Sequence, residues 1–252
     1  METIHPRDGI FATTRWSLIL SSGDSDGDEE QARAALAELC RIYWRPVFLF
    51  VCRGGHVPED AQDLTQDFFV MILETAWFQH ADENRGRFRS FLLASLQNFL
   101  NEARTKNHTL KRGGAVRFVS WDTWMAEAPS ELSFFSQAQE TLPAERLFDL
   151  RWAATVVEHA LRRLGEECEA KGRRRLFDAL SSYLTAERAD VSYAELAARL
   201  GLEESAIKRQ LHNLRERYRW LLRDEVAHTV ANPTEVDAEI RYLCATLAAG
   251  AE

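Results

Sequence analysis

The chain has 252 residues, of which 46% are apolar, and a formal net charge of −8 at pH 7. With only 12 glycines and 6 prolines, this composition excludes a disordered or collagen-like chain and favours a helix-rich protein with one long or two short domains. No apolar run is long enough to cross a membrane and no charged-then-apolar leader opens the chain, so we expect a soluble, cytoplasmic protein.

The negative charge argues at first sight against a nucleic-acid partner, but the charges are segregated along the chain. Acidic residues gather in 24–30, DSDGDEE. Basic residues dominate 101–117, which contains Arg104, Lys106, Lys111, Arg112 and Arg117. They also dominate 205–223, which contains Lys208, Arg209, Arg215, Arg217, Arg219 and Arg223. Two basic patches on an acidic body leave nucleic-acid binding open.

Apolar residues recur with a period near 3.6 along almost the whole chain, which predicts an all-α fold. The first stripe consists of Leu36, Leu39, Cys40 and Tyr43. Pro46 is expected to restart the chain as a second helix that ends at Gly54–Gly55. Because Cys40, Cys52, Cys168 and Cys244 form no CxxC motif, we expect small core residues rather than a zinc site or disulfides, and no cofactor.

The next helix is predicted over 59–74, with Pro58 near its first turn. Its buried side is predicted to carry Ala61, Leu64, Phe68, Met71 and Ile72. The opposite side carries Asp63, Gln66 and Asp67, and the whole helix lacks Lys and Arg. The helix macrodipole explains acidic residues in the first turn, but it does not reach Asp67 and gives no reason for the glutamine.

A further helix is predicted at about 88–105. Its inward positions are Leu92, Leu96, Phe99 and Ala103, and its outward positions are Asn98, Asn101 and Thr105. Phe88 and Phe91 could stack on bases, but their helical spacing favours the core. From Ser120 to about Thr141 the periodicity fails, which predicts a connector between domains whose aromatic residues dock on another surface.

Helices resume after Pro143, and the strongest local pattern lies at 191–222. Ser192 and Glu195 predict a capping box, and Gly201 permits a sharp turn. The predicted core positions are Tyr193, Leu196, Ala197 and Leu200 before the turn, then Ile207, Leu211, Leu214, Tyr218 and Leu221 after it. The pattern is typical of a helix-turn-helix whose second helix enters the major groove. The alternative is an ordinary pair of bundle helices with a solvated basic face.

The final segment, TVANPTEVDAEIRYLCATLAAG, predicts one amphipathic helix. Its apolar positions are Val236, Ile240, Leu243, Cys244 and Leu247. The helix could pack on the second domain, on a regulator, or in a core, and core packing is the favoured interpretation.

Three segments in this order resemble regions two and four of bacterial RNA polymerase sigma factors of the extracytoplasmic-function type: PEDAQDLTQDFF, FRSFLLASLQNFLNEAR and YAELAARLGLEESAIKRQLHNLRERYR. The resemblance covers about 12–120 and 145–225 and extends to FATTRWSLIL near the start. It implies an N-terminal segment (1–30), a region 2-like helical domain (31–118), a linker (119–143), a region 4-like domain (144–226) and a tail (227–252).

The resemblance also implies partners and residue roles. Asp63, Gln66 and Asp67 would bind the basic coiled coil of the β′ clamp of core RNA polymerase, and the second domain would contact the β flap. Residues expected to contact the minus-ten element are Arg89, Asn98, Asn101, Arg104, Lys106, Lys111 and Arg112. Those expected at the minus-thirty-five element are Ser205, Lys208, Arg209, His212, Arg215 and Arg217. The loop ADENRGRF matches the family's base-specificity loop, and an anti-sigma partner is one possible regulator.

Two other classes of function stay open at this point. A stand-alone helix-turn-helix regulator would need no polymerase-binding face and would normally dimerise on a palindromic site. An enzyme could use Asp60, Asp63 and Asp67 as a metal cluster, but no HExxH, P-loop or GxSxG motif accompanies them, so we expect no catalysis. One departure from the family pattern is Glu203, which stands where a Ser or Thr often caps the recognition helix.

Overall fold

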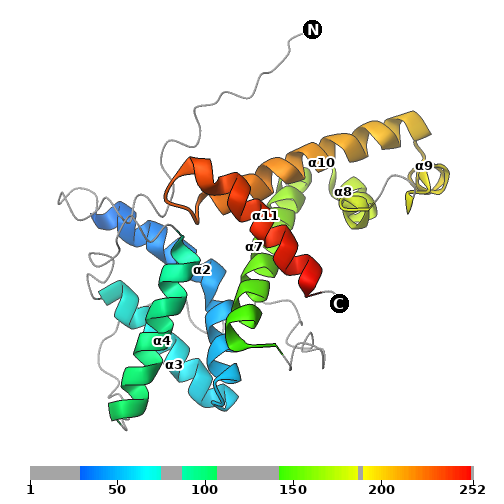
Figure 1. Cartoon of the computed structure of the whole chain (residues 1–252). Helices are drawn as coiled ribbons and strands as arrows, with labels where there is room; N and C mark the ends of the chain where they lie inside the picture. The colour runs from blue at the N-terminus through cyan, green and yellow to red at the C-terminus, as the bar shows by residue number, and fades with distance from the viewer. Residues whose placement is uncertain (1–28, 75–86, 107–141, 187–189, 251–252) are drawn as a thin grey trace. The chain divides into compact units, whose positions relative to one another are not determined.

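A computed structural model describes residues 29–74, 87–106, 142–186 and 190–250, with backbone only for 29–39, 41, 73–74 and 106. Its α-helices are α2 (Glu29–Arg53), α3 (Pro58–Glu74), α4 (Phe88–Lys106), α7 (Ala144–Ala170), α8 (Arg174–Leu180), α9 (Tyr193–Leu200), α10 (Glu204–Ala227) and α11 (Val236–Ala249) (Figure 1). Short 3-10 helices span Ser181–Tyr183 and Pro233–Glu235. These residues contain no strand, only an isolated bridge between Arg87 and Val230. The all-α prediction is therefore confirmed.

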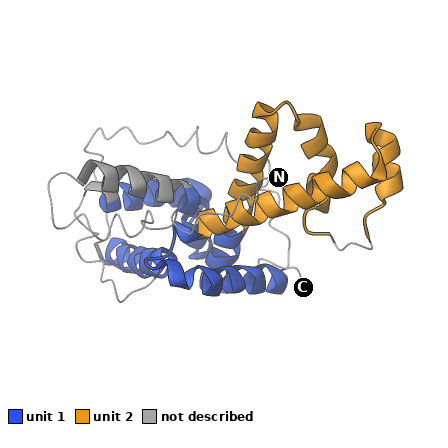
Figure 2. Ribbon diagram, turned by 90° about the horizontal axis from the view of Figure 1, so that it is seen from above, with its two compact units in different colours: residues 1–153, 227–252 blue, residues 154–226 orange. Residues whose placement is uncertain are grey.

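The chain divides into two compact units that differ from the domains expected from the sequence (Figure 2). Unit 1 consists of Met1–Ala153 together with Ala227–Glu252, and unit 2 consists of Ala154–Val226. The boundary lies inside α7, so residues 144–153 belong to unit 1. The C-terminal segment also belongs to unit 1. Unit 2 is thus inserted into unit 1 in the order of the chain.

The core of unit 1 is rich in aromatic side chains. Helices α3 and α4 both contact α2. The Tyr43 ring meets the Phe88 ring edge-on at a centroid distance of 4.9 Å, and the Phe68 ring lies 5.6 Å from the Phe99 ring. Such pairs add about 0.5–1.5 kcal/mol beyond the burial of their area. Phe88 and Phe91 are both buried, which confirms their interpretation as core residues.

The prediction that Pro46 divides the first helix is wrong, because α2 continues through it. Proline removes one backbone hydrogen bond and disfavours a helix interior. The residues around it, Ile42, Tyr43 and Val47, are almost completely buried. Tertiary packing of these side chains therefore outweighs the low helix propensity of proline. The helix ends at Arg53, and Gly55 has φ +93°, a left-handed conformation that glycine adopts without a Cβ penalty.

Helix α11 packs within unit 1, where Val236 and Leu243 are buried. At its C-terminal end Gly250 lies so close to α7 that an added Cβ would come within 2.5 Å of Leu150. Core packing of the tail helix is therefore the correct alternative among those left open. Cys244, however, is exposed, so its prediction as a core residue is wrong.

The other three cysteines are buried or half-buried, and all four are free thiols. Burial raises the pKa of the Cys52 thiol to about 11 and raises the pKa of Cys40 further. Both thiols are therefore protonated near neutral pH, which makes them poor nucleophiles.

The core of unit 2 is formed by the apolar faces of α7, α8, α9 and α10. Its members include Ala160, Leu164, Leu180, Leu196, Ala197, Ile207, Leu211, Leu214, Tyr218 and Leu221. All five core positions predicted for the second helix of the helix-turn-helix pattern are among them, and Tyr193 and Leu200 pack against their edge. No helix in the described ranges is long and apolar enough to span a membrane.

Some sequence predictions fall on residues outside the described ranges. They are the N-terminal segment with FATTRWSLIL, the connector at 120–141, residues 81–86 of the loop ADENRGRF, and the basic residues Lys111, Arg112 and Arg117.

Candidate functional site

Helix α3 presents an acidic and amide surface on the side away from its core. Asp63 is exposed, and Gln66 and Asp67 are partly exposed. On the other side Ala61, Thr65, Phe68, Phe69 and Ile72 are buried, and the Thr65 hydroxyl donates a 2.7 Å hydrogen bond to the Ala61 carbonyl. Burial of this side fixes the rotation of the helix, so its carboxylates and amides point outward. We call Asp63, Gln66 and Asp67 the acidic face.

Helix α4 carries an exposed polar stripe of a different kind. Asn98, Asn101, Arg104 and Thr105 are exposed, whereas Leu92 and Leu96 on the other side are completely buried. The Thr105 hydroxyl donates to the Asn101 carbonyl over 2.8 Å, and Arg104 donates to the Gly54 carbonyl over 3.3 Å. Residues three and four apart share a helix surface, so the two amides lie beside a cation. We call these four residues the amide face.

The structure places Arg89 in the interior of unit 1, which does not fit its expected role in contacting DNA. Arg89 is only 7% exposed. Its Nε donates to Glu239 over 2.6 Å, and its Nη1 donates to Asp149 over 2.9 Å. Burial acts to lower the pKa of Arg89, but the hydrogen bond and charge of Glu239 outweigh it and the net shift is upward. We therefore remove Arg89 from the minus-ten residues.

The structure describes the side chains of only some of the remaining residues predicted at the minus-ten element. The backbone of Lys106 closes α4, and its side chain lies beyond what is described. Lys111 and Arg112 lie in an undescribed range. Asn98, Asn101 and Arg104 are the predicted contacts that the structure places together.

In unit 2, helices α9 and α10 are joined by the predicted turn. Gly201 has φ +67°, and the Leu202 amide donates to the Ala197 carbonyl over 3.0 Å, as in a left-handed helix C-cap. The predicted capping box is wrong in detail: Ser192 occupies the N-cap, but its side chain makes no capping hydrogen bond. The Ser192 carbonyl instead accepts from the Leu196 amide.

The first half of α10 has an exposed polar surface. Its predicted contacts Ser205, Lys208, Arg209 and His212 are all exposed. Lys208 lies 3.4 Å from the Glu204 carboxylate and over the Tyr193 ring at 5.2 Å. An exposed ion pair of this kind contributes at most about 1 kcal/mol, so Lys208 can exchange Glu204 for a phosphate or a base edge. We call these four residues the basic face.

Arg215 and Arg217 do not share this surface, in contrast to the prediction. Arg215 donates to the carbonyls of Tyr183 and Ala186 over 2.8 and 2.7 Å. Arg217 is bound to Glu167 through two nitrogens and lies 4.1 Å over the Trp220 ring. Both guanidiniums hold elements of unit 2 together, so we remove them from the minus-thirty-five residues.

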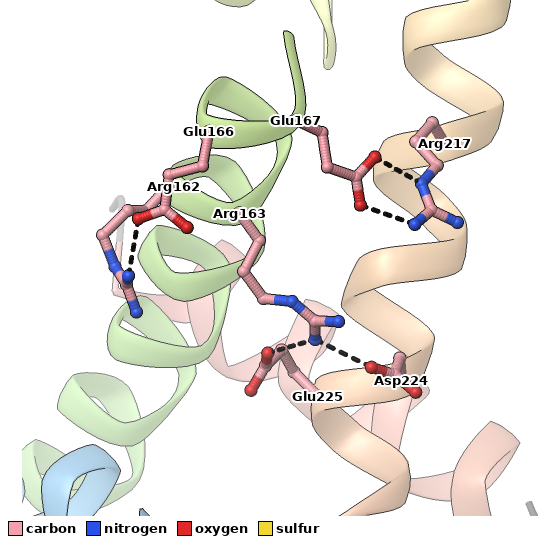
Figure 3. A network of polar contacts seen from close by, with 7 residues as sticks. All are labelled: Arg162, Arg163, Glu166, Glu167, Arg217, Asp224 and Glu225. Carbon is pink, nitrogen blue, oxygen red and sulfur yellow. Dashed lines mark hydrogen bonds and ion pairs between the residues drawn. The ribbon is translucent and has the colours of Figure 1, made fainter. Parts of the chain in front are cut away.

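A polar network joins α7 to α10 within unit 2 (Figure 3). Arg163 donates to Asp224 over 2.7 Å and also to Glu225, and these two carboxylates are only 8% and 3% exposed. Burial acts to lower the pKa of Arg163, but hydrogen bonds to the two acids outweigh it and the net shift is upward. Together with the Glu167–Arg217 pair, this network fixes the second half of α10.

The Glu167–Arg217 pair predicts a pH dependence of stability. Hydrogen bonding from Arg217 lowers the pKa of Glu167, so its contribution is present above the unfolded pKa, about 4.3, and is lost as pH falls through the folded pKa. We expect Glu167→Gln to lower the free energy of unfolding at pH 7 by less than about 1 kcal/mol, and this deficit to shrink below about pH 4. Urea titrations at several pH values measure it, with Glu195→Gln at an exposed position as control; a deficit that stays constant down to pH 3 would contradict this role.

Among the described residues, no three His, Cys, Asp or Glu side chains are grouped so that they could hold a metal ion. Asp60, Asp63 and Asp67 lie within the described residues and therefore form no such group.

Comparison of the chain with models of known protein families, with curated proteins and with solved structures gives no match.

Two residues that hold Arg89 in the interior of unit 1 are not among those that the sequence pattern singles out. Glu239 is completely buried and contacts Arg89, which is 150 positions away in the chain. Asp149 contacts the same guanidinium. Glu239 occupies a position that the tail's helical pattern left unassigned, and a buried glutamate requires a partner. An acid on the core side of an amphipathic helix is the signal that could have found it.

Proposed function

We propose that the chain is a dissociable promoter-specificity subunit of bacterial RNA polymerase, similar to sigma factors of the extracytoplasmic-function type. It has no catalysis of its own, needs no cofactor and acts in the cytoplasm. The acidic face binds the basic coiled coil of the β′ clamp. The amide face binds minus-ten DNA, to which Lys106, Lys111 and Arg112 add positive charge, and the basic face reads the minus-thirty-five element while unit 2 contacts the β flap.

The observation that carries this proposal is the outward orientation of the acidic face. A helix held in place by a mainly apolar buried side needs no particular charge on its other side, yet α3 exposes carboxylates and amides without a single Lys or Arg. A surface of one sign steers a partner of the opposite sign and fixes its register. The sequence resemblance names that partner as the polymerase clamp.

The two DNA-binding surfaces support the proposal through their different chemistry. The amide face offers hydrogen bonds and a cation, which suit unpaired bases and their backbone. The basic face lies at the start of the second helix after a glycine turn, where recognition helices contact base edges in the major groove.

The polymerase interface is tested by charge reversal. Asp63→Lys combined with Asp67→Lys is expected to weaken binding to core RNA polymerase by roughly 10- to 100-fold, which corresponds to about 1.4–2.7 kcal/mol and lies at the lower end of the coupling energies of close interfacial charge pairs. A fluorescence titration with purified core enzyme measures the affinity. The matched control is Asp190→Lys combined with Glu195→Lys, which makes the same charge change at exposed positions of unit 2. Unaltered affinity of the α3 variant, or an equal loss in both variants, would refute the assignment.

A stand-alone helix-turn-helix regulator is the second candidate, since the α9–Gly201–α10 geometry alone suits either protein. Such a regulator would bind a duplex palindrome as a dimer without polymerase. Measuring duplex binding with and without core enzyme separates the two, because the proposed subunit should show specific binding only with core enzyme.

A further inference from the structure

We propose that Glu239, in the C-terminal helix α11, is a positioning residue for the amide face of α4. It acts through Arg87 and Arg89, which lie immediately before and within the first turn of that helix. This inference rests on the proposed function for the role of the amide face. It implies that the tail helix α11 supports the DNA-binding surface of unit 1.

The Glu239 carboxylate is completely buried and lies between two guanidiniums. Its Oε1 accepts a 2.6 Å hydrogen bond from Arg89 Nε, and its Oε2 lies 2.8 Å from Arg87 Nε. Removing a carboxylate from water is costly unless opposite charges compensate it. Any movement that separates α11 from residues 87–89 would leave that charge without compensation, so the two elements move together.

A second set of contacts fixes the same guanidinium from α7. Arg89 Nη1 lies 2.9 Å from an Asp149 oxygen, and the Tyr242 hydroxyl donates to the other oxygen of Asp149. The Arg89 guanidinium also lies 4.0 Å over the Tyr242 ring. Helices α4, α7 and α11 therefore meet at one buried group of alternating charges.

The backbone ties the same residues to the C-terminal segment. The Phe88 amide donates to the Thr229 carbonyl over 3.1 Å, and Arg87 forms the antiparallel bridge with Val230. Residues 87–89 are thus held at two points by the chain that follows unit 2, through the main chain at 229–230 and through the side chain of Glu239.

This anchoring matters for the amide face because α4 is one continuous helix. At about 1.5 Å per residue, Asn98 lies roughly 14 Å along the axis from Arg89. A tilt of about 10° at the first turn would move the Asn98 amide by about 2 Å, which is enough to break a hydrogen bond to a base. A clamp at the first turn therefore sets the position of the amides.

The test uses full-length Glu239→Gln, which keeps the shape of the side chain and removes its charge. The control is Glu195→Gln, which makes the same change at an exposed acid of unit 2. Three quantities are measured: the affinity for core polymerase, the affinity of the resulting holoenzyme for the single non-template strand of a minus-ten region mapped with the wild type, and hydrogen exchange of the Phe88 and Phe91 amides in the free protein.

We expect Glu239→Gln to weaken single-strand binding by about tenfold or more while affinity for core polymerase stays within about twofold. The Phe88 and Phe91 amides should exchange faster, and Glu195→Gln should change none of the three quantities. Unaltered single-strand affinity would overturn the proposal. A parallel loss of single-strand and polymerase binding would also overturn it, because that result indicates general loss of unit 1 structure.

Failure of the proposed function and failure of the positioning role can be distinguished. If wild-type protein does not bind core polymerase, the proposed function fails, and the exchange rates alone then decide whether Glu239 holds the first turn of α4. If Glu239→Gln does not fold, Arg87→Gln replaces it, because the Arg87 side chain is 32% exposed and its loss is better tolerated. We expect the same loss of single-strand affinity and the same faster amide exchange as for Glu239→Gln. Absence of both effects would equally refute the positioning role.

Discussion

Replacing Arg89 by alanine is expected to lower the free energy of unfolding by about 3–5 kcal/mol, as found when one partner of a buried ion pair is removed. The variant leaves Glu239 buried without its shortest hydrogen bond and takes from Asp149 one of its partners. Urea denaturation followed by circular dichroism measures the change. The effect is large because the Glu239 carboxylate is completely buried and cannot reach water without separating α11 from α4.

Arg104→Ala is the matched control, since Arg104 is an exposed arginine on the same helix. We expect it to change stability by less than about 0.5 kcal/mol and to weaken binding of minus-ten DNA. A stable Arg89→Ala variant that loses only DNA affinity would contradict the structural role of Arg89 and restore the role expected from the sequence.

Phe68→Ala is expected to destabilise unit 1 by about 3–5 kcal/mol through loss of apolar contacts and creation of a cavity. The Phe68 ring is completely buried and lies within 5.6 Å of both the Phe69 and Phe99 rings. It holds α3 against α4, so the variant should also weaken binding of core polymerase by disordering the acidic face.

Val70→Ala is the control for this effect, because Val70 is only partly buried on the same helix. Its expected cost is within about 1 kcal/mol. Thermal and urea unfolding of both variants measure the difference. Equal, small effects of the two substitutions would show that the buried side of α3 is assigned incorrectly.

The exposed and buried faces of single helices could be predicted from the sequence, because a helix repeats every 3.6 residues and a core selects apolar side chains on one side. Asp63 on α3, Asn98 and Asn101 on α4, and Lys208 on α10 are all exposed as expected. The periodicity also placed Ile207 and Leu211 correctly in the core of unit 2.

Properties that depend on contacts between distant segments could not be predicted in this way. Arg89 is basic and close to the amide face, which predicts a contact with DNA, yet its partner Glu239 follows 150 positions later. Helical spacing predicts Arg215 on the recognition surface, but its long side chain extends away from that surface to the carbonyls of Tyr183 and Ala186.

The compact units also differ from the domain bounds expected from the sequence, for a related reason. The irregular composition of 119–143 suggested a boundary there, whereas Phe148 and Trp152 at the start of α7 are completely buried and belong to unit 1 with the tail helix. Apolar periodicity shows that a helix has a core face, but it does not show which core that face joins.

The most direct test of the central proposal is transcription reconstituted from purified core RNA polymerase and the full-length chain on genomic DNA, with mapping of the transcript ends. The proposal predicts discrete start sites that require the chain, share upstream elements, and disappear with the Asp63→Lys/Asp67→Lys variant. Transcript ends that are identical with and without the chain would contradict it.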